Sequence, residues 1–313
     1  MELTMKKRKW NKDYLFLQLP LHLMLIVPVV IVFIFSYLPF VGLLMAFQRF
    51  SPSLDGFWAA LFSSRFVGMD VFRFMFNFPS MGSILFNTVF IAVSKIISVI
   101  IFPLIFALML NEVRTAWFMR SVQTITFMPY FLSWVILGGI LIDILAVRGG
   151  AVNVIIGWFG IEPVNFLGEP RIFPWVLIIS HVWQQIGFNT IIILAAIINI
   201  DPGLYEAAAI DGAKRIRQTM HITIPSILPI VMLIAILALG GILRAGQDQV
   251  LNLYNPAVYS TGDILDTFVY RVGITQNQFS RATAVGLFQS LVSMVLIIIS
   301  YKLANKYSGY QVF

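Results

Sequence analysis

The chain contains no cysteine, and only 11% of its 313 residues are charged, compared with roughly 25% in a soluble domain. Without cysteine there is no disulfide framework, no thiol nucleophile and no thiolate metal site. Hydrophobic residues, in contrast, make up 59% of the chain. These proportions predict an all-α integral membrane protein.

The sequence also lacks the short motifs of several enzyme classes. It has no G-x-x-x-x-G-K-[ST], so it does not bind ATP through a P-loop of its own. H-E-x-x-H and G-x-S-x-G are missing too, and the three histidines, His22, His181 and His221, are far apart. We therefore expect no catalytic residue, no metal site, no cofactor and no enzyme activity in this chain.

Six apolar segments are long enough to cross a bilayer, which takes about 20 residues. They cover residues 15–38, 84–110, 122–145, 173–198, 224–243 and 282–303. Residues 39–81 are also apolar, but charged residues interrupt them, and we interpret this stretch as an extracytoplasmic interfacial cap. The predicted parts are an N-terminal tail, first helix and outer loop (1–83), a five-helix core that contains a cytosolic loop at 201–225 (84–304), and a cytosolic tail (305–313).

The formal net charge of +7 comes from basic residues scattered between apolar runs. This pattern indicates membrane orientation rather than nucleic-acid binding. With six spans, twelve of the 21 basic residues lie on the side of the N-terminus and eight on the other, and Lys95 lies within a span. The excess predicts that both termini are cytosolic.

A polar loop separates the fourth and fifth apolar segments and is predicted to be cytosolic. Asp201 is a good N-cap residue, Pro202 suits the first helical position, and Gly212 ends that helix. A second short helix is predicted from 213 to about 221, before Pro225 opens the next apolar segment. We therefore expect two small helices hinged at Gly212.

The residues of this loop resemble a known motif. Glu206-Ala-Ala-x-x-Asp-Gly-Ala, followed by Thr223-Ile-Pro-Ser-Ile-Leu-Pro229, is similar to the cytoplasmic EAA loop of permease subunits in bacterial ABC importers. Other blocks extend the resemblance over nearly the whole chain to the LplB-like branch of the carbohydrate importers. The main blocks are Asn87-Thr88, Ala107-Leu-Met-Leu-Asn-Glu112, Met128-Pro-Tyr-Phe-Leu-Ser-Trp134, Leu253-Tyr-Asn-Pro256, Asp266-Thr-Phe-Val-Tyr-Arg-Val-Gly273 and Ala282-Thr-Ala-Val-Gly-Leu-Phe288.

The resemblance implies a type I importer permease with a MetI-like core in the bacterial cell membrane. Its partners would be a second permease subunit, an ATPase dimer that carries ATP and Mg, and an extracytoplasmic sugar-binding protein. The substrate would be an oligosaccharide or polysaccharide fragment. The EAA loop would couple to the ATPase through Tyr205, Glu206, Ala207, Ala208, Asp211, Gly212, Lys214 and Arg215.

Polar residues within the spans are candidates for the sugar path, because they need protein or water beside them. In the fourth span, His181, Gln184 and Gln185 share a helix face, and Asn189 lies one turn beyond. Amides bond to sugar hydroxyls, and the indole of Trp183 can pack on a sugar ring. Interhelical polar packing explains the same stripe equally well.

The remaining path candidates are Lys95, Tyr130, Trp134, Gln289 and Asp248. For Lys95 we favour hydrogen bonds to carbonyls or a partner helix over a role as a cavity charge. Tyr130 and Trp134 also suit interface anchors. Gln247-Asp248 departs from the Phe-Glu expected from the resemblance, which puts any role of Asp248 in doubt.

An ion-coupled secondary transporter, or one half of such a carrier, is the main alternative, because six spans with polar residues also fit that class. Proton or sodium coupling would require an intramembrane carboxylate, and Asp143 is the only one near a predicted span. A structural membrane protein is the third possibility.

Overall fold

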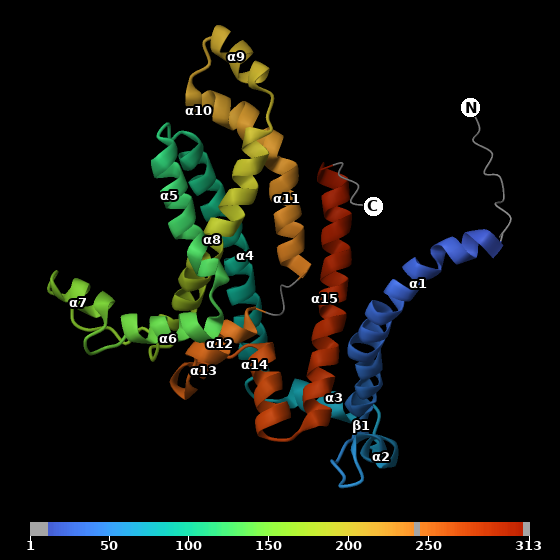
Figure 1. Ribbon diagram of the computed structural model, residues 1–313. Helices are drawn as coiled ribbons and strands as arrows, with labels where there is room; N and C mark the ends of the chain where they lie inside the picture. Colours follow the sequence, from blue (N-terminus) through green and yellow to red (C-terminus); the bar gives the residue numbers. More distant parts are fainter. Residues whose placement is uncertain (1–11, 241–244, 309–313) are drawn as a thin grey trace.

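The structure, a computed structural model, describes residues 12–240 and 245–308. These residues are mostly helical (Figure 1). Five of their helices are long and apolar enough to cross a membrane, or six spans result if one bent pair counts as a single crossing. The one sheet within the described residues is an antiparallel ladder of β1 (Gln48–Arg49) and β2 (Arg65–Phe66). The predicted helical membrane fold is confirmed.

The centre of the bundle is built from α4 (Met81–Asn111), α8 (Phe173–Ile198), α11 (Ile224–Gly240) and α15 (Phe279–Ser308). Buried apolar side chains join these helices in clusters. One cluster unites Ala107 of α4, Ile193 of α8 and Ile227 of α11. The bounds of α8 match the predicted fourth span, whereas α15 continues through residues 305–308 of the predicted tail. The predicted end of the fifth span, 241–243, lies outside the described residues.

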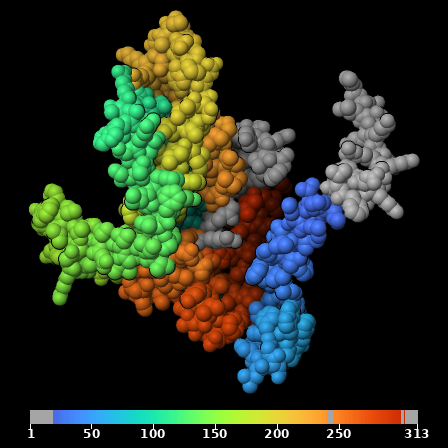
Figure 2. All heavy atoms as spheres, in the orientation of Figure 1, coloured from blue at the N-terminus to red at the C-terminus, as the bar shows by residue number. Residues whose placement is uncertain are grey.

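The first span is longer than the sequence predicts. Helix α1 (Lys12–Val32) continues through a π-helical turn, η1 (Phe33–Tyr37), into a 3₁₀ segment, η2 (Leu38–Phe47). The prediction that the span ends at Leu38 is wrong, because the chain remains helical across Pro39, which follows the π-helical turn η1. In Figures 1 and 2, α1 forms the right-hand arm of the molecule, and its most apolar window has no buried residue.

The third predicted span, 122–145, is broken. Helix α5 (Ala116–Phe127) and the turn η3 (Met128–Phe131) meet α6 (Trp134–Ile144) at an angle of 108°. The predicted segment is therefore not one continuous helix, because Leu132 and Ser133 are extended and Ser133 caps α6, its Oγ accepting from Ile136 N at 3.4 Å. Helices α6 and α7 (Ala151–Gly157) project to the left in Figures 1 and 2.

Short elements close the two ends of the bundle (Figure 1). At one end, α9 (Pro202–Ile210), α10 (Arg215–Gln218) and the π-helical turn η4 (Thr219–Thr223) form the loop between α8 and α11. The opposite end carries the β-ladder and two further groups of elements. They are α2 (Phe57–Ser63) and α3 (Asp70–Asn77), and then α12 (Gln247–Leu253), η6 (Pro256–Val258), α13 (Tyr259–Gly262), α14 (Leu265–Tyr270) and η7 (Arg271–Thr275).

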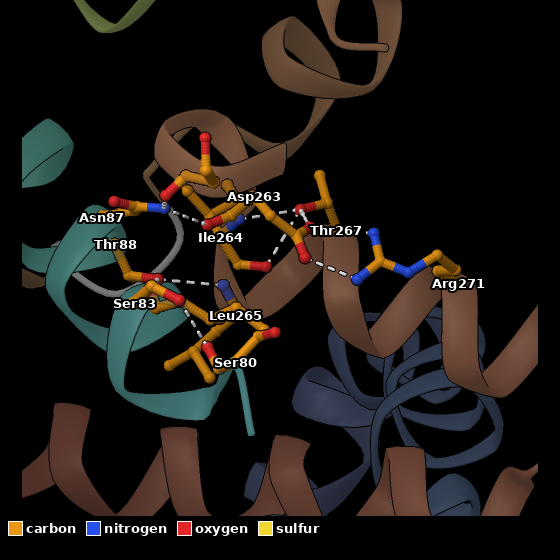
Figure 3. A network of polar contacts seen from close by, with 11 residues as sticks. Ser80, Ser83, Asn87, Thr88, Asp263, Ile264, Leu265, Thr267 and Arg271 are labelled. Carbon is orange, nitrogen blue, oxygen red and sulfur yellow. Dashed lines mark hydrogen bonds and ion pairs between the residues drawn. The ribbon is translucent and has the colours of Figure 1, made fainter. Parts of the chain in front are cut away.

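A buried polar network fastens this second group to α4 (Figure 3). Asn87 Nδ2 donates to the carbonyl oxygen of Asp263 at 3.2 Å, and Thr88 Oγ1 accepts from Leu265 N at 2.9 Å. The Asp263 carboxylate accepts from Thr267 and from Arg271. Asn87, Thr88, Thr267 and Arg271 belong to the blocks that carry the sequence resemblance, and the structure gives them a packing role.

An aromatic pair lies beside this network. The Arg271 guanidinium lies 4.6 Å from the centre of the Tyr259 ring, and the Tyr254 and Tyr259 rings are 5.1 Å apart. Burial raises the pKa of Tyr254 to about 12, with smaller contributions from its neighbours. The phenol therefore stays protonated at neutral pH.

Candidate functional site

The first candidate site is the tip formed by α9 and α10. Asp201 Oδ1 accepts from Gly203 N at 2.9 Å, which confirms the predicted N-cap of α9. At the other end, Ala213 N bonds to Ala208 O at 2.9 Å and Gly212 N to Ala209 O at 3.0 Å, the pattern of a Schellman motif. Gly212 has φ of 77°, which suits glycine. The helix stop at Gly212 is confirmed.

The second helix of the loop differs from the prediction. Helix α10 begins at Arg215 and runs without a break through η4 into α11. The prediction of a separate helix over 213–221 is therefore wrong. Pro225 follows the π-helical turn η4 directly, and the chain remains helical across it. The tip thus consists of one short helix, a glycine turn and the extended end of a membrane helix.

The tip exposes an apolar surface that the sequence analysis did not single out. We call it the tip patch, and it consists of Leu204, Ile210, Ile216 and Met220, which are 50%, 88%, 81% and 57% exposed. The same helix and the turn after it carry the charged residues Glu206, Asp211 and Lys214, together with Ala207. Exposed apolar residues beside charged ones are typical of a protein-binding surface. In the sequence, the sign of this apolar surface was Ile210, an apolar residue next to the turn at Gly212.

Two other residues of the predicted coupling set bond within the chain. The Arg215 guanidinium forms an ion pair with Glu112, at the end of α4. The Tyr205 hydroxyl lies 2.9 Å from Thr223 Oγ1, in η4. Together with Gln218 these residues line a hollow of about 370 Å³ between the tip and the end of α4. Both contacts therefore link the tip to the membrane helices.

The second candidate site is centred on Lys95, which is 4% exposed in the middle of α4. Its Nζ donates to Ala245 O at 2.6 Å and to Gln249 Oε1. Gln249 Nε2 in turn donates to Leu177 O at 2.8 Å and Ser180 Oγ at 2.7 Å of α8. Lys95 thus connects α4 to the start of α12 and to α8, in the carbonyl-bonded arrangement favoured above.

The polar stripe of α8 faces the break between η3 and α6. Gln184 is buried and its Nε2 donates to Leu132 O at 3.3 Å, which satisfies a carbonyl that the broken helix leaves free. Gln185 donates to Gln184 Oε1 at 3.2 Å. His181 stacks on Trp134 at 6.3 Å, and its buried Nδ1 has no hydrogen bond within the described residues.

The remaining path candidates are dispersed. Tyr130 stacks on Phe188 of α8 at 4.4 Å, Asn189 is half-buried, and Trp183 is 41% exposed. Gln289 donates to Asp266 Oδ1 at 2.9 Å beside a groove of about 490 Å³ that Ser290 and Ser293 also line. Asp248 lies on α12, and Asp143 is exposed on α6. The described part of the chain contains no group of three potential metal ligands.

Comparisons with known proteins agree with this arrangement. Residues 99–308 match the family described as "Binding-protein-dependent transport system inner membrane component". The chain is 38% identical to the polygalacturonan/rhamnogalacturonan transport system permease protein YteP of Bacillus subtilis, over 96% of this chain and 92% of that protein. It is also 38% identical to Protein LplB of the same organism, over 97% and 91%.

A solved structure shares the fold. One chain of a bacterial alginate ABC transporter, in complex with an alginate pentasaccharide-bound periplasmic protein, superposes with a TM-score of 0.87 at 31% identity. The match covers 96% of this chain and 99% of that one. The chain belongs to the family of binding-protein-dependent transport system inner membrane components.

Proposed function

We propose that this chain is a permease subunit of an ATP-driven importer. It forms half of the membrane path for an oligosaccharide or polysaccharide fragment and is moved by a separate ATPase. The observation that carries the proposal is the tip, a capped helix with a glycine turn that presents Glu206 and the tip patch. It is bonded to the end of α4 through Arg215 and to η4, which continues into α11, through Tyr205. Movement of the tip therefore reaches the membrane helices.

The proposed assembly has two permease subunits, two ATPase subunits at the tip and an extracytoplasmic sugar-binding protein at the other end. Similarity to a chain of a transporter solved with its periplasmic protein supports this composition. We further propose six spans, with the bent pair of α5 with η3 and α6 as the third crossing, and both termini on the cytosolic side of the cell membrane. The excess of basic residues on that side supports the orientation.

Reconstituted vesicles test the function against an ion-coupled carrier. The purified complex is placed in vesicles with radiolabelled oligogalacturonate or a neutral oligosaccharide outside, and uptake is measured with ATP inside or with an ion gradient alone. We expect uptake only with internal ATP and the ATPase subunits. Uptake driven by the gradient alone would support the secondary transporter.

The coupling role is tested by Glu206→Lys, with Glu162→Lys as the matched control, since both side chains are exposed but Glu162 lies in the loop before α8. We expect Glu206→Lys to leave assembly intact but to reduce transport per ATP hydrolysed at least about tenfold, because a charge pair at an interface sets register. Equal transport by both variants would leave the tip as a simple connector.

We also propose that the polar stripe of α8 lines the sugar path. Gln185 and Asn189 are the informative positions because, unlike Gln184, neither bonds to the backbone at the helix break. Gln185→Ala and Asn189→Ala should raise the KM for transport, while Thr283→Ala, whose hydroxyl bonds within α15, should not. Unchanged kinetics in a fully assembled complex would favour interhelical packing.

A further inference from the structure

A hollow of about 360 Å³ lies at the end of the molecule opposite the tip, between β1, α3 and the start of α15. Its walls combine aromatic rings with arginine side chains. They include Gln48, Arg49, Phe50, Phe74, Phe279 and Arg281. None of these residues belongs to the coupling tip or to the α8 stripe.

The hollow is held in shape by contacts between its walls. Phe50 N donates to Ser280 Oγ at 2.8 Å, which ties the end of the strand to α15. The Arg281 guanidinium lies 3.9 Å from the centre of the Phe74 ring, and its Nη1 donates to Gln278 Oε1 at 2.5 Å. The guanidinium is thus fixed before a ligand arrives, which lowers the entropic cost of binding.

The charges around the hollow do not balance. Arg49 lies directly across the β-ladder from Arg65, and like charges in that position destabilise a ladder. Asp70 is the acid in the wall, but it pairs with Arg73 at 3.1 Å. Among the described residues, the ion pairs leave out Arg49, Arg65 and Arg281. The hollow therefore favours an anion.

The position of the hollow along the membrane helices indicates which class of anion it binds. The candidate spans end at Phe47 and begin at Phe279, so the hollow lies where two membrane helices reach the same surface. The neighbouring cap exposes Phe57, Trp58 and Phe62, at 46%, 47% and 74%. Tryptophan is enriched at the boundary between lipid tails and headgroups, and Trp with Phe forms the apolar face of helices that lie in that boundary.

We propose that this hollow binds the headgroup of an anionic phospholipid of the outer leaflet. The Arg49 and Arg281 guanidinium groups hold the phosphate through charge-assisted hydrogen bonds, and the exposed rings of the cap contact the acyl chains. A zwitterionic lipid with a quaternary ammonium is disfavoured by the same arginines. An acidic sugar offers similar chemistry through its carboxylate, and the experiment separates the two sources.

Native mass spectrometry of the full chain in mild detergent measures the binding, with phosphatidylglycerol and phosphatidylcholine as probes. We expect wild-type protein to retain phosphatidylglycerol preferentially and Arg49→Gln/Arg281→Gln to bind it about tenfold more weakly, a change of about 1.4 kcal/mol. Arg148→Gln, an exposed arginine in the loop after α6, is the matched control. Arg49→Gln alone keeps the test usable if loss of the Arg281 stacking prevents folding.

Three results would overturn the proposal. Equal retention of phosphatidylglycerol by wild-type protein and a folded Arg49→Gln variant removes the role of the arginines. Equal retention of phosphatidylcholine and phosphatidylglycerol removes the preference for net negative charge. Displacement of the lipid by trigalacturonate at millimolar concentration, with Arg49-dependent binding of that sugar, reassigns the hollow to an acidic carbohydrate.

Discussion

At the scale of single residues, the missing side chain of Gly246 leaves space for the buried ammonium of Lys95. Gly246 has φ of 86°, and a Cβ added to it would lie 2.7 Å from Lys95 Nζ. The lysine is buried, and a lysine at the centre of a membrane helix costs roughly 2.5 to 3.5 kcal/mol on insertion scales, so its hydrogen bonds matter. A glycine at this turn therefore leaves room for the ammonium to bond with Ala245 O and Gln249.

Gly246→Ala should consequently destabilise the protein more than Gly149→Ala. Gly149 also has positive φ, of 78°, but nothing lies within 4 Å of the place that an added Cβ would take, so both variants share a backbone strain of about 1–2 kcal/mol. Only Gly246→Ala disturbs the buried hydrogen bonds of Lys95, at a further cost of about 1–3 kcal/mol. Thermal unfolding of the purified chain in detergent measures the difference.

A double variant tests the cause of this difference. In a Lys95→Met background the ammonium is gone, so Gly246→Ala should cost less than it does in the wild-type chain. Additive effects would show that the strain at Gly246 has another origin than Lys95.

At the scale of helices, Gly187 sets how closely α8 approaches α5. A Cβ on this glycine would lie 2.3 Å from Thr126 O, on the rigid backbone of α5. Gly187→Ala should therefore push the two helices apart and destabilise the protein by about 1–3 kcal/mol. Gly139→Ala in α6 is the control, because nothing lies within 4 Å of its Cβ position and alanine is the better helix former. Equal unfolding temperatures for the two variants would contradict the close approach.

The same helices show how far the sequence determines the prediction. The apolar run of α8 ends at clear polar signals, and its predicted bounds match the structure. The break at Leu132 was not predicted, although Pro129 and the N-cap residue Ser133 are local signals for it. Apolar residues on both sides gave the appearance of one span, and the partner that satisfies the Leu132 carbonyl, Gln184, is 52 residues away. Long-range pairs of this kind carry little local signal.

The candidate site also combines features that the sequence predicted with features that it did not. The N-cap of α9 and the turn at Gly212 depend on neighbouring residues, and both were predictable. The ion pair of Arg215 with Glu112 joins residues 103 positions apart, and the network of Asp263 with Asn87 spans 176. Neither was predicted, because each depends on the packing of separate helices.

The Glu112–Arg215 pair leads to a prediction about how the tip moves α4. Both side chains are largely exposed, so the pair contributes only about 0.2–1 kcal/mol to stability. Glu112→Arg and Arg215→Glu should each place like charges together and reduce ATP-driven uptake several-fold while leaving the unfolding temperature almost unchanged. The double variant Glu112→Arg/Arg215→Glu should restore uptake. Failure of the double variant to recover would mean that Arg215 acts on another partner.

At the scale of the whole molecule, the arm formed by α1 has an apolar surface that the rest of the described chain leaves exposed. Its span exposes apolar side chains along its length, including Met24 at 72% and Phe35 at 75%. Its continuation, η2, packs on the bundle, where Ala46 is buried against Phe72 and Ala284. Lipid or a second subunit must therefore cover the arm, because apolar surface of this extent is not stable in water.

The orientation of the molecule can be tested directly, because a chain without cysteine accepts a single cysteine as a unique label. Lys214→Cys lies at the tip, and Leu54→Cys lies in the opposite cap, where Leu54 is fully exposed. With the tip cytosolic, a membrane-impermeant maleimide should label Leu54→Cys on intact spheroplasts and Lys214→Cys only in inverted vesicles. Detergent-solubilised protein gives the full labelling of each site as the control. Labelling of both cysteines from the same side of the membrane would contradict an odd number of crossings between them. Reversed labelling would place the tip, with its exposed Glu206, outside the cell, where no ATPase could reach it.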